Sequence, residues 1–346
     1  MSHWRSDTTT VYEGGDCNRI PTLHHAKTPQ VPNNPRPTIF TARKHRNTDE
    51  VVELVNAFFL RHWPFKNKKQ EQRFIDEGYA WFVCINCPMS LDERMHWGCQ
   101  LLTTGFLIDD LLDRMSIEEG KEHQENVIKC ASGTILPDRE IPAQWIMFDL
   151  FEEMRATDRP LADELLKPTI DFLRAQVDGN RMKRMNLDEY FAYRNADLGK
   201  GMLSGIMCLC AGLSITREEL ELAEEVEENC MKHITFVNDI CSYDKEVMTA
   251  SKGSELGAMC SSVPIIKADH RVEDDQEAKS MMWEMVRDWE LRHFELVEKI
   301  SSENNISPAL AKYLKGVEYQ AAGNERWSLL TPRYNKTGSL AFNEGR

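Results

Sequence analysis

The sequence predicts an all-α fold, a single bundle of about ten helices or more packed around a centre. From about residue 48 onward, apolar side chains recur at helical spacing. No segment shows the sustained period-two alternation of β-branched residues that indicates strands. The interior has no Gly/Ser-rich or Pro-rich linker and no internal repeat, and a single domain of 346 residues can bury about 75% of its unfolded surface. We therefore expect one domain large enough to enclose a cavity as well as a core.

The chain divides into three parts. Residues 1–45 are polar and contain five prolines from Pro21 to Pro37, which predicts a mobile or extended arm. Residues 46–335 form the predicted helical domain, and 336–346 the predicted flexible tail. The first helix is indicated by an i, i+3, i+4 stripe of Val51, Leu54, Val55, Phe58 and Phe59.

The same spacing recurs over 145–154, 161–172, 220–234 and 281–300. Loop signals fall at 88–91, 131–142, 157–160, 178–181 and 251–257.

Composition excludes several classes of function. The net charge of −14 argues against nucleic acid as a partner, although metal ions can reverse the local sign for a small anionic substrate. No apolar leader is present, and no apolar run approaches the roughly 20 residues of a membrane span. We expect a cytoplasmic protein whose ten cysteines are reduced thiols. The lone pair Cys84 and Cys87 predicts buried small side chains rather than a metal site.

The first polar motif is Asp109-Asp110-Leu-Leu-Asp113, which follows the apolar stretch 101–108. Asp109 and Asp113 share one helix face, since they are four residues apart. Carboxylates on an apolar helix are costly unless a cation meets them, and Mg²⁺ prefers such oxygen ligands and also bridges diphosphates. A surface acidic cluster is the alternative.

The second polar motif is Asn238-Asp-Ile-Cys-Ser242-Tyr-Asp-Lys245-Glu246. Asn238, Ser242 and Glu246 are spaced at i, i+4 and i+8, so their oxygens follow one helical stripe. An amide, a hydroxyl and a carboxylate make an incomplete shell for one magnesium ion, which phosphate and water can complete. The alternative is a polar helix end with ordinary hydrogen bonds.

Together the two motifs resemble the aspartate-rich and NSE/DTE motifs of class I terpene synthases, of the fungal and bacterial sesquiterpene type. The resemblance covers about 40–335 and implies the class I terpenoid synthase fold, a single-domain all-α helical bundle around a central apolar cavity. Tyr190-x-x-x-Arg194 matches the pattern that holds the family's diphosphate-sensing arginine, and Asp197 matches the Asp three residues later. The family often has Gly next, where this chain has Leu198 followed by Gly199.

The resemblance continues at the C-terminal end. Trp327 and the pair Arg333-Tyr334 match a terminal Trp and Arg-Tyr pair, and Phe106 lies where the family places a cavity aromatic.

The resemblance implies a Mg²⁺-dependent cyclase that ionises a linear isoprenyl diphosphate, most simply farnesyl diphosphate, and releases diphosphate. Three Mg²⁺ ions are implied: Asp109 is the ligand of two, with Asp113 as a further candidate, and the second motif holds the third. Asp110 is expected to pair with Arg333 on closure. The implied diphosphate ligands are Arg194, Lys245, Arg333 and Tyr334.

An apolar pocket then has to keep water from the carbocation. Its candidate aromatic residues are Phe106, Trp327, Trp81, Phe82 and Phe236, with the first two favoured by position.

Other readings remain. A chain-elongating trans-prenyltransferase normally carries two Asp-rich motifs, whereas the second motif here contains Asn238, Ser242 and Glu246. A protonation-initiated cyclase needs a DxDD acid, which the sequence lacks. A non-enzymatic helical scaffold would show no stabilisation by Mg²⁺ with diphosphate. The sequence fixes neither the substrate's chain length, nor the product skeleton, nor a hydrocarbon as against an alcohol product, nor whether the protein is a homodimer, as is common in the family.

Overall fold

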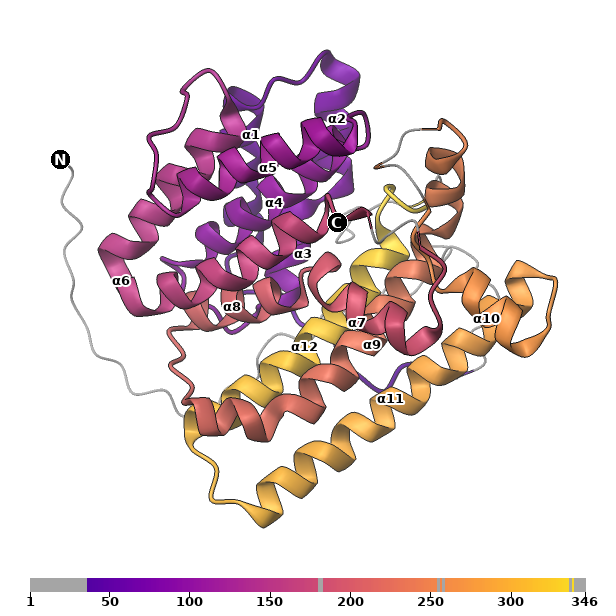
Figure 1. Ribbon diagram of the computed structural model, residues 1–346. Coiled ribbons are helices and arrows are strands. Elements are labelled where there is room, and N and C mark those ends of the chain that lie inside the picture. The colour runs from indigo at the N-terminus through magenta and orange to yellow at the C-terminus, as the bar shows by residue number, and fades with distance from the viewer. Residues whose placement is uncertain (1–35, 180–182, 254–255, 257–258, 336–337, 339–346) are drawn as a thin grey trace, which may run out of the picture.

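The computed structural model describes residues 36–338, except for 180–182, 254–255, 257–258 and 336–337 (Figure 1). Within these residues all regular secondary structure is helical, which confirms the predicted all-α fold. The helices are α1 Thr48–His62, α2 Lys68–Glu77, α3 Tyr79–Asn86, α4 Met95–Leu112, α5 Ile117–Ala131, α6 Pro142–Ala175, α7 Leu187–Asp197, α8 Lys200–Ala211, α9 Arg217–Ala250, α10 Val263–His270, α11 Asp275–Glu303 and α12 Pro308–Leu330. None of the described helices is both long and apolar enough to cross a bilayer.

Local sequence explains where many helices begin. Capping boxes pair Ser116 with Glu119, Asn186 with Glu189 and Thr216 with Glu219 at the starts of α5, α7 and α9. Proline occupies the first turn of α6, α10 and α12, where its missing N–H has no helical acceptor in any case. Of the two helices that carry the polar motifs, α9 begins with such a capping box, whereas α4 has no side-chain cap.

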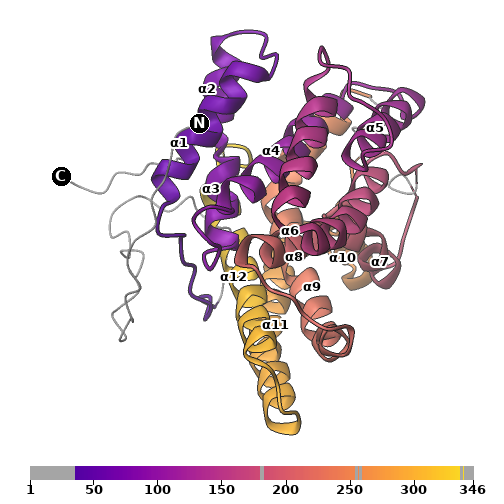
Figure 2. The same ribbon diagram turned by 90° about the vertical axis from the view of Figure 1, so that its left-hand side faces the viewer.

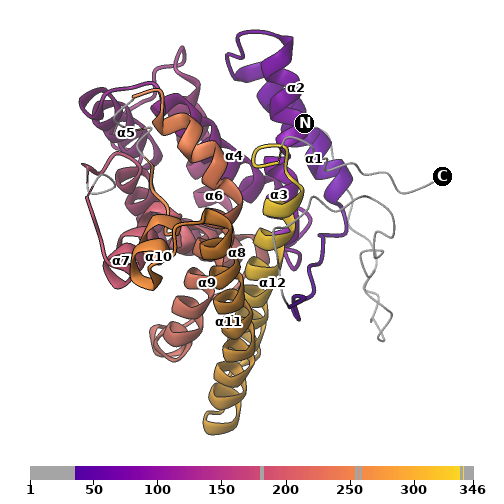
Figure 3. The ribbon, with the colours of Figure 1, turned by 90° about the vertical axis from the view of Figure 1, so that its right-hand side faces the viewer.

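Helices α9, α11 and α12 pack together on one side of the molecule, and α4, α5, α6 and α8 on the other (Figure 1). Helix α3 joins the two groups, because it packs against both α4 and α12. Helices α1 and α2 lie outside α3 (Figure 2), and α10 lies beside α11 (Figure 3). The two polar motifs therefore sit on α4 and α9, in different groups.

The loop expected at 157–160 is instead a kink within α6. Asp158 leaves helical geometry at φ −149° and ψ 79°, two residues before Pro160, whose ring cannot fit inside a regular turn. The Asp158 carboxylate then accepts from Leu161 N–H at 3.4 Å and pairs with Arg94 at 3.0 Å. Hydrogen bonds to the Asp158 side chain thus replace backbone hydrogen bonds that are lost at the kink, and α6 continues beyond it.

Residues 36–45, part of the predicted arm, pack against the helical domain. Arg36 pairs with Glu284 at 2.6 Å, Thr38 donates to Glu290 at 2.8 Å, and His45 N–H donates to the Cys84 carbonyl at 2.9 Å. Residues 1–35 lie outside the described residues, as does the predicted tail 336–346 apart from Gly338.

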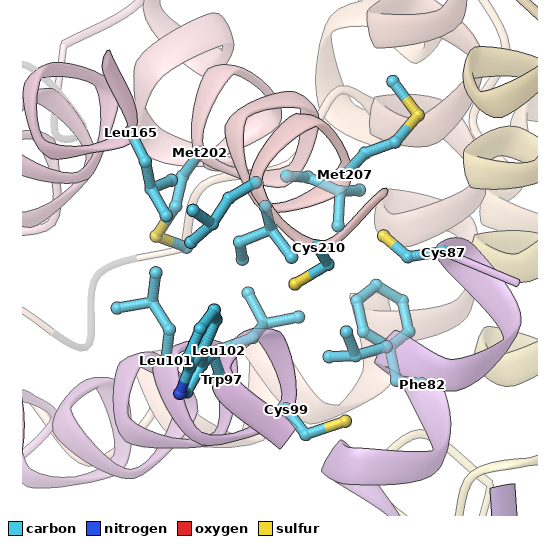
Figure 4. Packing of buried hydrophobic residues seen from close by; sticks show 14 of the residues in the cluster. Phe82, Cys87, Trp97, Cys99, Leu101, Leu102, Leu165, Met202, Met207 and Cys210 are labelled. Atoms are coloured by element: carbon cyan, nitrogen blue, oxygen red, sulfur yellow. The ribbon is translucent and has the colours of Figure 1, made fainter. Parts of the chain in front are cut away.

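The main core lies between α3, α4, α6 and α8. Its side chains in Figure 4 include Phe82, Leu101, Leu102, Leu165, Met202 and Met207. The nine described cysteines are free thiols, and Cys84 and Cys87 are buried as predicted. Burial raises the pKa of the Cys87 thiol well above its usual value, so this thiol stays protonated.

Candidate active site

A cavity opens between α4, α6, α8, α9 and α12. Its wall is apolar and includes Phe82, Leu102, Phe106, Phe172, Leu203 and Trp327. Its rim is polar and includes Asp109 and Asp113 from the first motif and Asn238, Ser242 and Glu246 from the second. The two predicted sets of oxygen donors, 125 residues apart in sequence at Asp113 and Asn238, therefore meet around one cavity.

The aspartate motif occupies the last turn of α4, with Asp113 as the residue that follows the helix. Burial and the negative charge of Asp109 raise the pKa of Asp113. Asp110 is half-buried, which by itself would raise its pKa, but the charges of Arg333 and Lys245 outweigh this effect and the net shift is downward. Two neighbouring carboxylates that repel each other, on the rim of a pocket, form a site that favours a cation.

The second motif lies within α9, where Ser242 donates to Glu246. Burial, followed by the nearby charge of Asp239, raises the pKa of Glu246 to about 7. Its Oε2 atom is buried and has no hydrogen-bond partner among the described residues. A buried carboxylate oxygen without a donor is destabilising by itself, and a hard divalent cation would satisfy it.

The donor set therefore fits a metal. Asn238, Ser242 and Glu246 offer oxygens from one face of α9, and Asp109 and Asp113 offer carboxylates from across the cavity. These groups are hard oxygen ligands, the kind that Mg²⁺ takes.

Arg194, from the last turn of α7, reaches the second motif. Its guanidinium donates to Asn238 Oδ1 at 2.9 Å and to Asp239 Oδ1 at 3.2 Å, and it also pairs with Asp197. Asp239 is fully buried and accepts from the Tyr190 hydroxyl at 2.7 Å and from Ser262 N–H at 2.8 Å. Asp239 thus fixes the predicted Tyr190-x-x-x-Arg194 pair against α9.

The C-terminal end of α12 closes the other side of the rim. Arg333 donates to Asp110 at 3.0 Å and to Asp109 at 3.2 Å, and the Tyr334 hydroxyl accepts from Asn238 at 3.0 Å. Lys245 lines the same cavity. The structure thus brings together all four predicted diphosphate ligands, and it contains the predicted Asp110–Arg333 pair.

Comparisons with known proteins agree with this geometry. Residues 100–292, more than half of the chain, match the model of terpene synthase family 2, C-terminal metal binding. The aristolochene synthase of Aspergillus terreus is 44% identical over 302 residues, which cover 87% of this chain and 94% of that protein. The chain belongs to the terpene synthase family.

Solved structures agree with this assignment. The crystal structure of aristolochene synthase from Penicillium roqueforti matches with a TM-score of 0.77 at 40% identity, covering 86% of this chain and 99% of that one. Germacradien-4-ol synthase from Streptomyces citricolor matches with a TM-score of 0.69 at 15% identity, covering 84% of this chain and 98% of that one, which supports the fold alone.

The cavity of this terpene synthase contains three of the five predicted aromatic residues. Phe82 and Trp327 meet edge to face with ring centroids 4.9 Å apart, and Phe106 lies 5.5 Å from Trp327. The prediction for Phe236 is wrong. Ile234 and Asn238 face the cavity, so Phe236 lies on the far side of α9, where it packs on Phe191 and Trp289.

Trp81 is also not a wall residue of this cavity. It directly precedes Phe82 in α3, so its side chain points about 100° away around the helix.

Sequence reasoning missed several residues of the cavity. They are Phe172 and Gln176 at the end of α6, Lys200 at the start of α8 and Asn324 in α12. Gly199, the predicted substitute for the family's glycine, lies between α7 and α8 with φ +72° and lines the cavity beside Leu198. Of these residues, Lys200 is the one that the sequence could have indicated, because it directly follows the helix break at Leu198 and Gly199.

A second cluster of metal-ligand types lies away from the rim. His233, Glu290 and Glu325 are buried together, but Arg287 donates to Glu325 at 2.6 Å and pairs with Glu290. The guanidinium already pairs with both carboxylates, so we interpret the cluster as a structural ion network.

Proposed function

We propose that this terpene synthase ionises farnesyl diphosphate in the presence of magnesium and cyclises the resulting carbocation to a sesquiterpene. The observation that carries the proposal is the convergence of two oxygen-donor motifs and the four candidate diphosphate ligands on the rim of one apolar cavity. Relatives at 40–44% identity are named aristolochene synthases, which supports a sesquiterpene product, either a hydrocarbon or an alcohol.

Three magnesium ions are proposed between the motifs. Asp109 would hold two of them, with Asp113 as a further candidate ligand, and Asn238, Ser242 and Glu246 would hold the third. When bound, these ions neutralise the diphosphate and so lower the barrier to breaking the allylic C–O bond.

The residues of the chain do the rest of the binding. Arg194 and Lys245 donate to the diphosphate from α7 and α9, and Arg333 and Tyr334 donate from the turn after α12. Asp110 holds Arg333 in place through the contact at 3.0 Å. Positive groups on several helices thus keep the leaving group fixed while the carbon chain turns away from it.

The apolar wall protects the cation. Phe106, Trp327 and Phe82 present ring surfaces to the cavity, and each aromatic face in contact with a cation contributes about 0.5–2 kcal/mol. Exclusion of water by these side chains prevents early quenching and leaves the folded chain time to cyclise. The released diphosphate is the proposed base for the final deprotonation.

The test is incubation with geranyl, farnesyl or geranylgeranyl diphosphate and Mg²⁺, with the volatile products analysed by mass spectrometry. We expect a cyclic C15 product from farnesyl diphosphate and none without the metal. Longer linear chains formed on addition of isopentenyl diphosphate would instead identify a prenyltransferase.

We also propose a cytoplasmic location, because the nine described cysteines are free thiols, as a reducing compartment maintains.

A further inference from the structure

Glu77 is a buried carboxylate outside the two metal motifs. It is the last residue of α2, and Gly78 follows in the left-handed conformation at φ 66° before α3 begins at Tyr79. Only 3% of Glu77 is exposed, although the side chain is acidic. Burial of a carboxylate is costly unless donors meet it, so its partners indicate what it does.

Three donors meet the Glu77 carboxylate. Arg73 Nε donates to Oε1 at 2.6 Å, and the Tyr79 hydroxyl and Arg333 Nη1 donate to Oε2, the latter at 3.3 Å. Arg333 Nη1 also donates to the Tyr79 hydroxyl at 2.7 Å. One edge of the Arg333 guanidinium is therefore fixed on the α2–α3 corner.

The other edge of the same guanidinium faces the aspartate motif. Arg333 Nη2 donates to Asp110 at 3.0 Å and to Asp109 at 3.2 Å. The guanidinium also lies over the rings of Tyr79 and Phe106, 5.6 Å from each centroid. Its position relative to the rim is thus set from two sides, by Glu77 and by the aspartates.

The backbone of Glu77 holds the cavity wall as well. Its carbonyl, free at the C-terminal end of α2, accepts from the Trp327 indole N–H at 2.9 Å and from the Thr331 hydroxyl at 3.0 Å. Trp327, Thr331 and Arg333 all belong to the end of α12 or the turn after it. The α2–α3 corner therefore anchors the whole segment that closes the rim.

We propose that Glu77 is a positioning residue that holds Arg333 between the aspartate motif and the diphosphate, and limits how strongly Arg333 competes with magnesium for Asp109. This inference rests on the proposed function. Glu77 and Tyr79 accept from Nη1, so the Nη2 group is the one that faces Asp109 and Asp110 on the rim. Without the Glu77 charge, Arg333 would neutralise Asp109 and Asp110 more strongly, and Asp109 would bind a metal ion less well.

The test uses Glu77→Gln, which keeps the size of the side chain and removes its charge. A glutamine oxygen cannot serve two guanidinium groups as a carboxylate does, and its amide NH₂ faces donors. The measurement is the affinity for Mg²⁺ with inorganic diphosphate, by calorimetry, on the full-length protein. We expect a roughly tenfold or larger loss, the size that follows from losing one hydrogen bond to a charged group.

Glu290→Gln is the matched control. Glu290 is equally buried and accepts from Arg287, but it lies in α11, in the ion network away from the rim. We expect the control to lower the melting temperature and leave the diphosphate affinity within about twofold, a change below 0.5 kcal/mol. A Glu77→Gln variant that loses thermal stability and keeps wild-type affinity would reduce Glu77 to a structural role and overturn the proposal.

Two further variants cover the case in which Glu77→Gln fails to fold. Glu77→Asp moves the charge away from Arg333 and Tyr79→Phe removes one acceptor of Arg333 Nη1, so each should bind Mg²⁺ with diphosphate less tightly than the wild type. Wild-type affinity in both variants would contradict the proposal. Failure of the wild-type protein to bind Mg²⁺ with diphosphate would instead overturn the proposed function itself.

Discussion

The Phe172 ring is held between two glycines, and Gly199→Ala tests what this contact does. Gly199 has φ +72°, and a Cβ atom built there would lie 2.9 Å from Cδ2 of Phe172. On the opposite side, a Cβ at Gly105 would lie 3.2 Å from Cε1 of the same ring. Because Phe172 lines the cavity, a methyl group at residue 199 must displace part of the cavity wall.

Two costs add in this variant. The left-handed backbone costs an alanine about 1–2 kcal/mol, and the clash with the ring adds about 1–3 kcal/mol of overpacking. Gly133→Ala is the control, since Gly133 has φ +69° but a Cβ there would meet Glu152 and Arg155 only at 3.7 and 3.9 Å. The control isolates the backbone cost.

The assay combines urea unfolding with product analysis after incubation with farnesyl diphosphate. We expect Gly199→Ala to be less stable than Gly133→Ala by about 1 kcal/mol or more, and to be the one variant of the two with an altered product distribution. Equal losses of stability in the two variants, with identical products, would refute the idea that Gly199 is needed for the position of the Phe172 ring.

Three more outcomes are expected. Asp109→Ala and Asn238→Ala should each abolish most turnover and leave the fold intact by circular dichroism; retained turnover in either would remove that residue from the metal ligands. Deletion of 336–346 should leave turnover in place, and its complete loss would show that the tail is needed. Burial lowers the pKa of His293 to about 4 in the folded protein, whereas an exposed histidine has a pKa near 6.5. Below about pH 6.5 the unfolded chain therefore binds more protons at this residue than the folded protein does. The free energy of unfolding should therefore fall by about 2 kcal/mol between pH 7 and pH 5 from this residue, and His293→Leu should remove that part of the slope in urea titrations.

Most of the fold and the arrangement of the metal motifs could be predicted from helical spacing in the sequence. Asp109 and Asp113, or Asn238 and Ser242, are neighbours within one helix, so their shared face follows from sequence separation alone. The same rule would have excluded Phe236, which lies two positions from Asn238 and hence on another face of α9.

Tertiary packing decided the rest of the site. Phe172 and Asn324 reach the cavity because of how α6 and α12 cross their neighbours, which no local pattern in the sequence encodes. Glu77 is 32 residues from Asp109 in sequence and meets Arg333 only through the α2–α3 corner. Contacts between residues so far apart in the sequence cannot be predicted from local spacing and are seen only in the three-dimensional structure.

A crystal structure of the protein with Mn²⁺ and diphosphate tests the central claim most directly, because anomalous scattering locates each Mn²⁺ ion. The account predicts ions bound by Asp109 and by the oxygens of Asn238, Ser242 and Glu246, with the diphosphate between them in contact with Arg194 and Arg333. Ions bound elsewhere, or diphosphate bound without contact to either motif, would contradict it.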